Sequence, residues 1–298
     1  MPETNTGANA QSAEEFVFSS ADYDRVRRIL KSRAGIELGP GKRNLAYGRL
    51  ARRLRELRLD SFAAYLDQVD DPASIEATPF VNALTTNVTE FFREKHHFSL
   101  LRDRVLPEVM RARRQSRRIR IWSAGCSSGE EPYSLAMTVA QHIPPNEGWD
   151  VKILATDIDS DVLRNAVAGI YPMDRLERLN RELVSRFFQR GTGGRAGYAR
   201  VRDEVRRLVV FKQLNLMEDW PMSGPFDVIF CRNVIIYFEP PTRQRLIDRY
   251  VRLLADPGFL FLGHSESLVA SSVNVEQCGP TAYRRGETSL APARTVAA

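Results

Sequence analysis

The sequence has 298 residues, and because domains average roughly 100–200 residues it is long enough for two of them. Hydrophobic residues make up 43% and charged residues 27%, which argues against a disordered chain and indicates an ordinary globular protein. No stretch approaches the ~20 apolar residues needed to span a bilayer, and residues 1–20 lack the basic and apolar regions of a secretion signal. We therefore expect no direct membrane insertion.

Cysteine and histidine usage indicates a reducing compartment and no metal centre. The three cysteines, Cys126, Cys231 and Cys278, are odd in number and widely spaced, so they form neither a disulfide framework nor a CxxC metal pair. His96 and His97 are adjacent and so cannot share a helix face, while the other two histidines stand alone. The sequence predicts a cytoplasmic protein without metal ligands.

Positive charge is concentrated in two blocks, although the net charge is only +6. The segment from Arg25 to Arg58 contains twelve lysines and arginines against two acidic residues, and a second cluster of arginines lies between Arg102 and Arg120. A single basic run is usually a solvated helix face. Two blocks in one chain favour an anionic partner, either nucleic acid or an acidic protein surface.

The first part of the chain has only helical signals. Residues 1–20 form a tail without periodicity, and residues 21–90 contain three helical patterns separated by turns. Asp22 is predicted to cap the first helix, and the third helix starts near Ser61. We expect a helical domain over residues 21–90, followed by a linker helix over residues 91–118.

The second of these helices combines an apolar stripe with a basic surface. Leu50, Leu54 and Leu57 are spaced at i, i+4 and i+7 and therefore share one face. This spacing predicts a helix that packs on one side and presents charge on the other. The remaining circumference carries Arg49, Arg52, Arg53, Arg55 and Arg58.

Short apolar runs alternate with helical patterns in the rest of the chain. This alternation predicts a doubly wound, mainly parallel α/β sheet over residues 119–286. Residues 171–207 interrupt the rhythm, so we expect an inserted β-subdomain there with a small antiparallel hairpin, and a flexible tail over residues 287–298. The predicted strands are Ile119–Trp122, Val151–Ala155, Leu208–Leu216, Phe226–Cys231 and Gly258–Gly263.

The turn after the first strand, Ala124–Gly129, is the expected ligand site, because such sheets bind ligands at the carboxyl ends of their strands. It lacks the GxGxxG spacing, and Glu130 and Glu131 would repel a pyrophosphate; alternatively, they only compensate the helix dipole. Asp157 ends the second strand, where a carboxylate commonly accepts hydrogen bonds from a ribose diol. A ligand that carries a ribose and a positive charge, but no pyrophosphate, is more consistent with S-adenosylmethionine than with NAD.

Five segments then carry a family resemblance. They are Leu84–Glu94, Ser127–Ser134, Thr156–Asp159, Phe230–Phe238 and Gly263–Glu266. In this order they closely resemble the CheR-type chemoreceptor methyltransferases, from about residue 21 to about residue 285. The resemblance implies S-adenosylmethionine-dependent methylation of glutamate side chains on bacterial chemotaxis receptors, with glutamate methyl esters and S-adenosylhomocysteine as products. It also implies a Rossmann-like, class I methyltransferase-like domain beside the helical one.

The resemblance assigns site residues by position. Tyr237 is similar to a tyrosine placed close to the methyl group. The matching cofactor contacts are Asn87, Thr89, Arg93, Glu131, Asp157, Asn215, Leu216, Arg232 and Asn233.

Several of these residues could instead have a purely structural role. Asn87 and Thr89 can cap a helix at Phe91-Phe92, Asn215 can form an Asx-turn, and Tyr237 can be a core aromatic. In addition, Glu130 is as acidic as its neighbour Glu131, so either of the two glutamates can be the one that contacts the cofactor.

The implied reaction needs positioning rather than a base. A glutamate carboxylate has an unperturbed pKa near 4.3 and is already ionised at pH 7, so oxygen, methyl carbon and sulfur need only be held in line. Arg93 and Tyr237 are the predicted orienting groups, although Arg93 can instead bind the carboxylate of the cofactor. His264 is left out of the catalytic set.

Two partner sites are predicted. The arginine face formed by Arg49, Arg52, Arg53 and Arg55 suits an acidic receptor helix. In some family members the β-subdomain binds a receptor C-terminal peptide by strand addition, and those members have a loop similar to Arg190–Gly197. The glycines of this loop can also simply permit a turn. A nucleic-acid methyltransferase is the weaker interpretation, because few aromatic residues accompany the basic blocks. A non-catalytic binding module is the other alternative.

Overall fold

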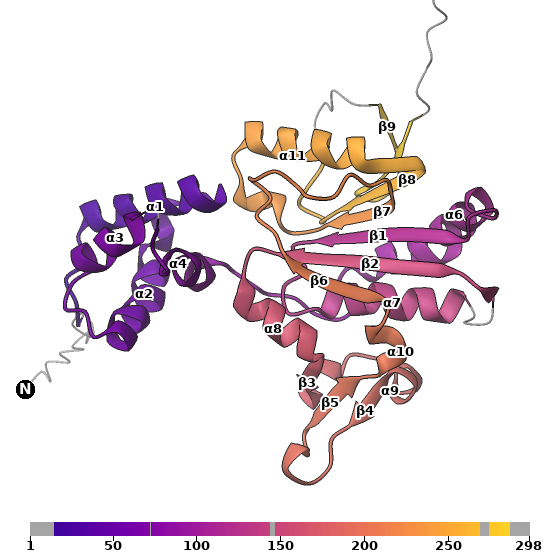
Figure 1. The fold of residues 1–298 in the computed structure, drawn as a ribbon, viewed down its shortest axis with the longest axis horizontal. Helices are drawn as coiled ribbons and strands as arrows, with labels where there is room; N and C mark the ends of the chain where they lie inside the picture. The colour runs from indigo at the N-terminus through magenta and orange to yellow at the C-terminus, as the bar shows by residue number, and fades with distance from the viewer. Residues whose placement is uncertain (1–14, 72, 144–146, 269–273, 287–298) are drawn as a thin grey trace, which may run out of the picture. The chain divides into compact units, whose positions relative to one another are not determined.

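The computed structural model describes residues 15–71, 73–143, 147–268 and 274–286 (Figure 1). The chain divides into two compact units, one formed by residues up to 84 except 34–36, and the other by residues 34–36 together with those from 85 onward. Each unit is described by itself. In the part of the chain that the structure describes, no helix has both the length and the apolarity required to cross a bilayer.

The first unit is helical, as predicted. Its α2 helix buries Leu50 and Leu54 completely and leaves Leu57 partly exposed, so the predicted stripe does pack inward. Aromatic rings from Phe18 and Phe62 meet in the same core at 4.3 Å between ring centroids. The helices are α1 Ser20–Ala34, η1 Pro40–Lys42, α2 Arg43–Leu57, α3 Phe62–Asp70 and α4 Ala77–Leu84.

The first helix is capped by Ser19, so the prediction that Asp22 caps it is wrong. The Ser19 hydroxyl accepts a hydrogen bond from the Asp22 backbone N–H at 3.0 Å, and the Asp22 carboxylate accepts one from the Ser19 N–H at 2.9 Å. The two residues form a reciprocal capping box, in which the acid is the third helical residue. Ser61 does cap α3, since its hydroxyl accepts a hydrogen bond from the Ala64 N–H.

A helical run follows residues 85–94 in the second unit. Its three segments are continuous, because each one is followed directly by the next. The run begins at Lys95 and ends at Ala112, inside the expected span of 91–118, and residues 91–94 form turns instead. The segments are α5 Lys95–Leu100, the π-helical turn η2 Leu101–Val105 and α6 Leu106–Ala112.

A seven-stranded sheet forms the centre of the second unit, with the order β6-β2-β1-β7-β8-β10-β9 (Figure 1). The first five strands in this order are parallel, whereas β10 is antiparallel to both of its neighbours. This confirms the predicted fold class. The strands are β1 Arg118–Ala124, β2 Asp150–Asp157, β6 Val209–Gln213, β7 Phe226–Cys231, β8 Leu254–Leu262, β9 Val275–Gly279 and β10 Ala282–Arg285.

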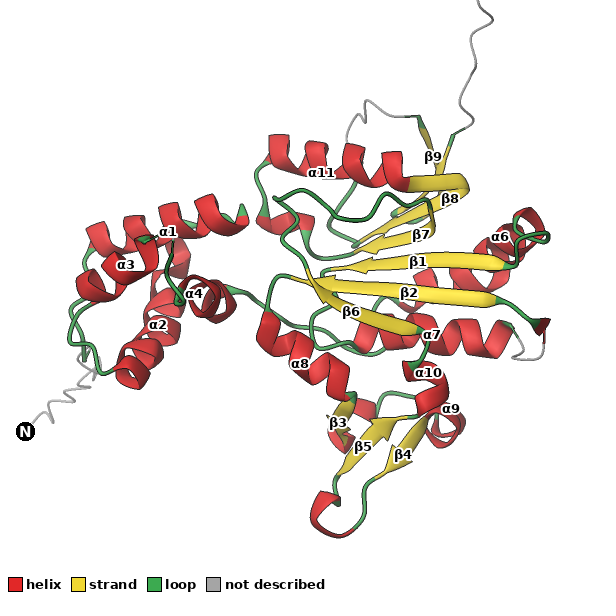
Figure 2. Cartoon of the chain, viewed as in Figure 1, coloured by secondary structure: helices red, strands yellow, loops and turns green. Residues whose placement is uncertain are grey.

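Helices cover both faces of this sheet (Figure 2). Along β1, Ile121 joins a core cluster with α7 residues, while the next residue, Trp122, joins a second cluster with α11 residues. Successive side chains of a strand point to opposite faces, so each face has its own core. The covering helices are α7 Glu130–His142, α8 Ser160–Ala168 and α11 Pro240–Leu253.

The predicted insertion is a small subdomain with a three-stranded antiparallel sheet in the order β3-β5-β4. The expected hairpin is the β4–β5 pair, and β3 adds the third strand. Its elements are β3 Ile170–Pro172, η4 Met173–Leu176, α9 Arg181–Phe187, β4 Phe188–Arg190, η5 Gly193–Arg195, β5 Tyr198–Val201 and α10 Asp203–Arg206.

Candidate active site at the carboxyl edge of the sheet

The parallel strands end at one edge of the sheet, and most predicted site residues follow directly on a strand end. Glu131 lies in the first turn of α7, one short turn after β1. Asp157 ends β2, Asn215 follows β6, and Arg232 follows β7. The topology therefore gathers these residues at one edge, where a doubly wound sheet binds its ligands.

A second chain segment, residues 85–94, reaches the same edge from outside the sheet. The side-chain amide of Asn87 donates a hydrogen bond to the Asp159 carboxylate at 2.7 Å, and the Phe92 backbone N–H donates one to the Ser134 hydroxyl at 2.9 Å. Asn87 therefore does not cap a helix at Phe91-Phe92, since those residues form a turn. Thr89 lies half-buried in this segment, and its carbonyl accepts a hydrogen bond from Arg175.

The glycine turn after β1 is closed by protein contacts. The backbone N–H groups of Gly125 and Cys126 both donate to the Thr156 carbonyl oxygen, at 2.8 and 2.9 Å. Gly125 has φ +81°, and a Cβ atom there would lie 2.2 Å from a methyl carbon of Val234. The turn was predicted as the ligand site. At Gly125 the close neighbour is instead the turn that follows β7.

Asp157 is a buried carboxylate, with 8% of its surface exposed. Its two oxygens accept hydrogen bonds from the backbone N–H groups of Ser127 at 2.8 Å and Asp159 at 3.0 Å. Burial outweighs these hydrogen bonds and raises the pKa of Asp157 to about 6. An ionised Asp157 would therefore gain from hydroxyl donors or positive charge brought to it by a ligand.

Arg232 is the centre of a buried charge cluster. Its guanidinium lies 3.1 Å from the Glu131 carboxylate and 3.4 Å from the Glu94 carboxylate, and it also donates to the Arg93 carbonyl oxygen. Only 1% of its side chain is exposed, and protein groups accept hydrogen bonds from both terminal nitrogens of the guanidinium, while its Nε is buried without a hydrogen-bond partner among the described residues. A contact with the cofactor is then left to its main chain at the strand end.

The structure also distinguishes between the two adjacent glutamates. Glu131 faces the strand ends, where its carboxylate accepts a hydrogen bond from the Ser123 hydroxyl at 2.7 Å and pairs with Arg232. Glu130 is 2% exposed and points elsewhere, since its carboxylate accepts a hydrogen bond from Ser128 and lies 4.0 Å from Arg175 of the subdomain. The geometry favours Glu131 as the residue that meets a ligand.

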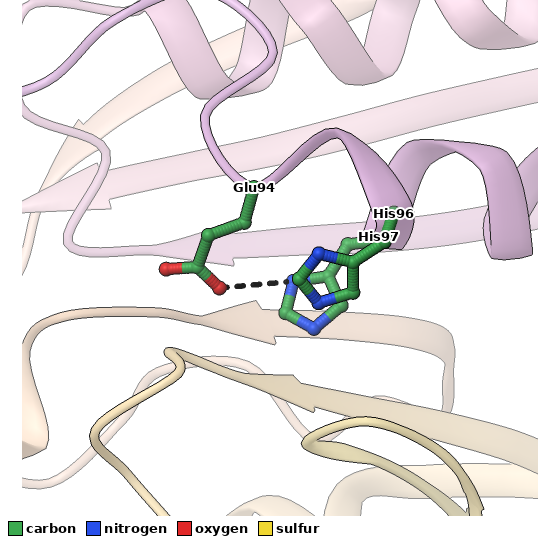
Figure 3. A group of neighbouring side chains, drawn as sticks. All are labelled: Glu94, His96 and His97. Atoms are coloured by element: carbon green, nitrogen blue, oxygen red, sulfur yellow. Dashed lines mark ion pairs between the residues drawn. The ribbon is translucent and has the colours of Figure 1, made fainter.

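The buried His97 and the exposed His96 both lie near Glu94, although adjacent residues do not share a helix face. Their rings lie 4.2 Å apart, and the ligand atoms of Glu94, His96 and His97 lie within 4.8 Å of one another (Figure 3). They converge because both histidines lie in the first turn of α5, directly after Glu94 in the left-handed conformation at φ +56°. Burial, together with the charge of Arg232, lowers the pKa of His97 to about 4, so its ring is neutral. The same Arg232 guanidinium already supplies positive charge to Glu94 and opposes a second cation.

Three further predicted residues have clear structural settings. Asn215 forms the Asx-turn that was the alternative to a cofactor contact, since its side-chain oxygen accepts a hydrogen bond from the Met217 N–H at 3.0 Å. Leu216 is buried. Asn233 has φ +59°, and Tyr237 ends the short helix η6 Ile235–Tyr237, where it is partly exposed.

Sequence reasoning gave no role to two carboxylates of this edge. Glu94 bonds Arg232 and His264, and Glu266 accepts three backbone hydrogen bonds. Both residues lie inside the motifs that carry the family resemblance, so their positions were visible in the sequence. Their partners are distant along the chain, and only the fold reveals them.

The charges at this edge fit a cationic cofactor. Carboxylates outnumber guanidinium groups there, and burial raises the pKa of Glu131 as it does that of Asp157. A pyrophosphate would meet repulsion in such surroundings, whereas the sulfonium and ammonium of S-adenosylmethionine would be attracted.

The predicted docking arginines belong to the helical unit and differ in availability. Arg53 donates to both oxygens of the Glu76 carboxylate at 2.8 Å, so it is largely committed to its own domain. Arg49 is half-buried, and it donates to the Ala83 carbonyl oxygen. Arg52 and Arg55 have 79% and 56% of their side chains exposed, which makes them the available part of the surface.

Two family models match the chain and together span nearly all the described residues. Residues 21–85 match the CheR methyltransferase all-alpha domain, and residues 87–284 match the CheR methyltransferase SAM binding domain. The chain belongs to the CheR methyltransferase family. This confirms the predicted family and S-adenosylmethionine as the cofactor of this CheR chain.

Full-length relatives agree with this assignment. The chain is 49% identical over 288 residues to chemotaxis protein methyltransferase 2 of Pseudomonas aeruginosa, covering 95% of this chain and 99% of the relative. It is 43% identical to the chemotaxis protein methyltransferase of Escherichia coli K12, covering 95% and 97%. Against that of Borreliella burgdorferi it is 36% identical, covering 89% and 94%. The predicted enzyme class, an S-adenosylmethionine-dependent methyltransferase, is confirmed for this CheR protein, and a non-catalytic module or a nucleic-acid methyltransferase is not favoured.

Proposed function

We propose that this CheR methyltransferase esterifies glutamate side chains on the cytoplasmic helices of chemotaxis receptors and releases S-adenosylhomocysteine. The observation that carries the proposal is the match of both domains, over 95% of the chain, to methyltransferases named for chemotaxis. The carboxylate-rich edge of the sheet supports it, because it suits a cationic methyl donor. The enzyme would act in the cytoplasm, where those receptor helices lie.

The chain's residues divide the work of holding the cofactor. S-adenosylmethionine supplies an activated methyl group on a sulfonium, which is a good leaving group. In this proposal Asp157 accepts hydrogen bonds from the ribose hydroxyls and Glu131 meets positive charge, which is supported by their positions at the end of β2 and in the first turn of α7. The proposed further contacts come from the outer segment and from the turns after β6 and β7, namely Asn87, Thr89, Arg93, Asn215, Leu216, Arg232 and Asn233.

The substrate carboxylate needs orientation and no proton transfer. It is ionised at pH 7, so the enzyme has only to bring one oxygen into line with the methyl group. Arg93 and Tyr237 are the proposed orienting groups, since each can donate to the carboxylate without neutralising it chemically. Both lie partly exposed on segments that border the sheet edge.

The proposed function is tested by the fate of a labelled methyl group. The protein is incubated with isotope-labelled S-adenosylmethionine and receptor cytoplasmic domains, and the labelled product is then treated with base. A glutamate methyl ester releases labelled methanol, whereas an N-methyl product keeps its label. Label that resists base, or that appears only on added nucleic acid, would contradict the proposal.

Cofactor binding is expected to weaken below about pH 6. Because the pKa of Asp157 is raised, protonation of this carboxyl stabilises the folded, ligand-free protein relative to the unfolded chain. This stabilisation is complete below the ordinary pKa near 3.8 and is lost as the pH rises through about 6. A ligand that needs the ionised carboxylate must therefore release a proton in acid. Titration calorimetry should find S-adenosylhomocysteine binding about tenfold more weakly at pH 5 than at pH 7.

The control for this pH effect is Asp157→Asn. It should bind the same ligand more weakly throughout and show no such change between pH 5 and pH 7. Equal affinity of the wild-type protein at both pH values would remove Asp157 from the ribose site.

The exposed arginines of α2 support receptor docking. Arg52 and Arg55 pair with Glu56 and Glu15, and these are exposed ion pairs of small energy. They are therefore easily exchanged for glutamates of a receptor helix, whereas the pair of Arg53 with the buried Glu76 is not.

The subdomain offers a separate peptide site at the edge of β4. Among the described residues, β4 pairs with β5 alone, which leaves its other edge for a receptor C-terminal peptide. Gly193 and Gly197 of the adjoining loop have φ +58° and +88°, so these two glycines also serve the turn. A peptide held there would raise the local concentration of receptor glutamates.

Both contacts are tested in one binding experiment. Affinity for a receptor cytoplasmic fragment should fall about tenfold in the Arg52→Ala/Arg55→Ala double variant and should fall with rising salt. Arg164→Ala, an exposed arginine of the other unit, should bind like the wild type. Removing the receptor tail should weaken binding further in every variant. An affinity that does not change with salt concentration would exclude docking through the arginines of α2. An affinity that does not change when the receptor tail is removed would exclude the β4 site.

A further inference from the structure

Glu266 is a buried carboxylate whose hydrogen bonds all come from backbone N–H groups among the described residues. It follows β8 and has 3% of its surface exposed. One oxygen accepts hydrogen bonds from Gly263 at 2.6 Å and from Asn233 at 2.8 Å, and the other accepts one from Ile236 at 3.2 Å. A single side chain therefore ties the end of β8 to the turn that follows β7.

That turn carries two of the proposed site residues, Asn233 and Tyr237. Asn233 is in the left-handed region at φ +59°, which asparagine adopts more readily than most other non-glycine residues. The turn then closes in η6, where the Tyr237 N–H donates to the Val234 carbonyl oxygen at 3.2 Å. Its geometry depends on contacts from outside, because a helix of three residues has little stability of its own.

The turn is enclosed on two sides. On one side Val234 fills the space that a Cβ atom of Gly125 would take, at 2.2 Å. On the other, a Cβ atom on Gly263 would lie 2.5 Å from the side-chain nitrogen of Asn233 and 2.8 Å from the Glu266 carboxylate. Neither glycine can gain a methyl group unless the turn moves.

We infer that Glu266 is a positioning residue for methyl transfer, which holds Asn233 toward the cofactor and Tyr237 toward the methyl group. The inference rests on the proposed function, since it takes the roles of those two residues from it. The N–H groups of Asn233 and Ile236 fix the turn in two places, and that of Gly263 ties the same carboxylate to the end of β8. This matters because a displacement of about 1 Å at a reacting centre can cost about 100-fold in rate.

The same sheet provides a matched control in Asp227. It is also a carboxylate with 3% exposure, and it accepts a hydrogen bond from the backbone N–H of Arg120 at 2.7 Å and one from the Arg113 side chain at 2.8 Å. It lies near the start of β7, at the end of the strand opposite to the 233–237 turn. Loss of either carboxylate weakens the fold, but only Glu266 contacts the site.

The test compares Glu266→Gln with Asp227→Asn. Glutamine must turn an amide N–H₂ toward backbone donors, so we expect kcat to fall about 100-fold while Asp227→Asn stays within about twofold of wild type. Urea unfolding should show a comparable loss of stability in both. Normal kcat in folded Glu266→Gln, or an equal loss in Asp227→Asn, would overturn the inference.

A second variant and a second readout keep the test decisive. Gly263→Ala retains the carboxylate and displaces the turn, so it should lose kcat in the same way, and normal turnover in that variant would overturn the inference even where Glu266→Gln fails to fold. A wild-type protein that transfers no label to receptors would refute the proposed function instead. In that case the affinity for S-adenosylhomocysteine tests the role of Glu266 in place of kcat. We expect Glu266→Gln to bind this ligand about tenfold more weakly than Asp227→Asn, and equal affinities would overturn the inference.

Discussion

Replacing Arg232 with methionine is expected to lower the free energy of unfolding by about 3–5 kcal/mol at pH 7, because it leaves two largely buried carboxylates, 10% and 12% exposed, without their cation. The Arg232 side chain is 1% exposed and pairs with both Glu94 and Glu131. The Arg232 guanidinium carbon also lies 5.7 Å from the Phe98 ring centroid and 5.8 Å from that of Phe230, so methionine removes these cation–π contacts together with the two ion pairs. Urea unfolding with a single probe of the second unit measures it.

The loss of unfolding free energy in Arg232→Met should be smaller in acid. Burial by itself would raise the pKa of Glu94, but Arg232 and a hydrogen bond from His264 bring it down to about 2. A lowered carboxyl pKa stabilises the wild type above the ordinary pKa near 4.5 and stops doing so as pH falls through about 2. In Arg232→Met the carboxylate is instead destabilising when ionised, so the difference from wild type narrows between pH 7 and pH 4.

The matched control is Arg164→Met, which removes an arginine whose side chain is 74% exposed and pairs with Asp161. It should unfold like the wild type at both pH values. An Arg232→Met variant that is as stable as this control would show that the buried cluster does not hold the site together.

Replacing Arg93 with alanine is expected to reduce kcat/KM for receptor methylation by about 10²–10³-fold, the usual effect of removing one preorganised donor. Arg93 lies between two non-glycine residues in the left-handed region, Phe92 at φ +54° and Glu94 at φ +56°. The fold holds this conformation through the Phe92 bond to Ser134 and the Arg232 bond to the Arg93 carbonyl. Backbone strain of this kind concentrates at functional sites.

The same variant decides between the two roles of Arg93. If the guanidinium binds the carboxylate of the cofactor, the dissociation constant for S-adenosylhomocysteine rises in Arg93→Ala together with the loss of rate. If it orients the substrate, kcat falls and that constant stays unchanged. Arg93→Lys keeps the charge but not the planar fork, so it should recover part of the rate. Activity within about threefold of wild type in Arg93→Ala would remove the residue from the mechanism.

The sheet was predictable because most of its strands have a local apolar pattern. The run Phe226–Cys231 is buried on both faces, and β7 begins and ends where the apolar run does. The third predicted strand was too long, since Leu214 and Leu216 belong to the turn after β6. The fifth was too short, since β8 already begins at Leu254. The antiparallel pair β9 and β10 was missed, because these short strands alternate too weakly to be recognised without their neighbour.

The site was predictable as positions and not as contacts. Strand ends and family motifs place Glu131, Asp157 and Asn233 at one edge of the sheet, and the topology agrees. The ion pairs of Arg232 with Glu94 and Glu131, and of Arg53 with Glu76, join residues that are far apart in the sequence. No local sequence pattern encodes such pairings. The sequence therefore identified these arginines as candidate site residues but not the carboxylates with which they form ion pairs.

A crystal structure of the protein with S-adenosylhomocysteine would test the proposed site most directly. We expect the ligand at the carboxyl ends of β1, β2 and β7, with its ribose hydroxyls on Asp157 and its amino group near Glu131. Its sulfur should lie beside Tyr237, and the Asn233–Tyr237 turn should keep its hydrogen bonds to Glu266. A ligand bound at the other edge of the sheet, or one that leaves Asp157 without contact, would contradict the proposed site.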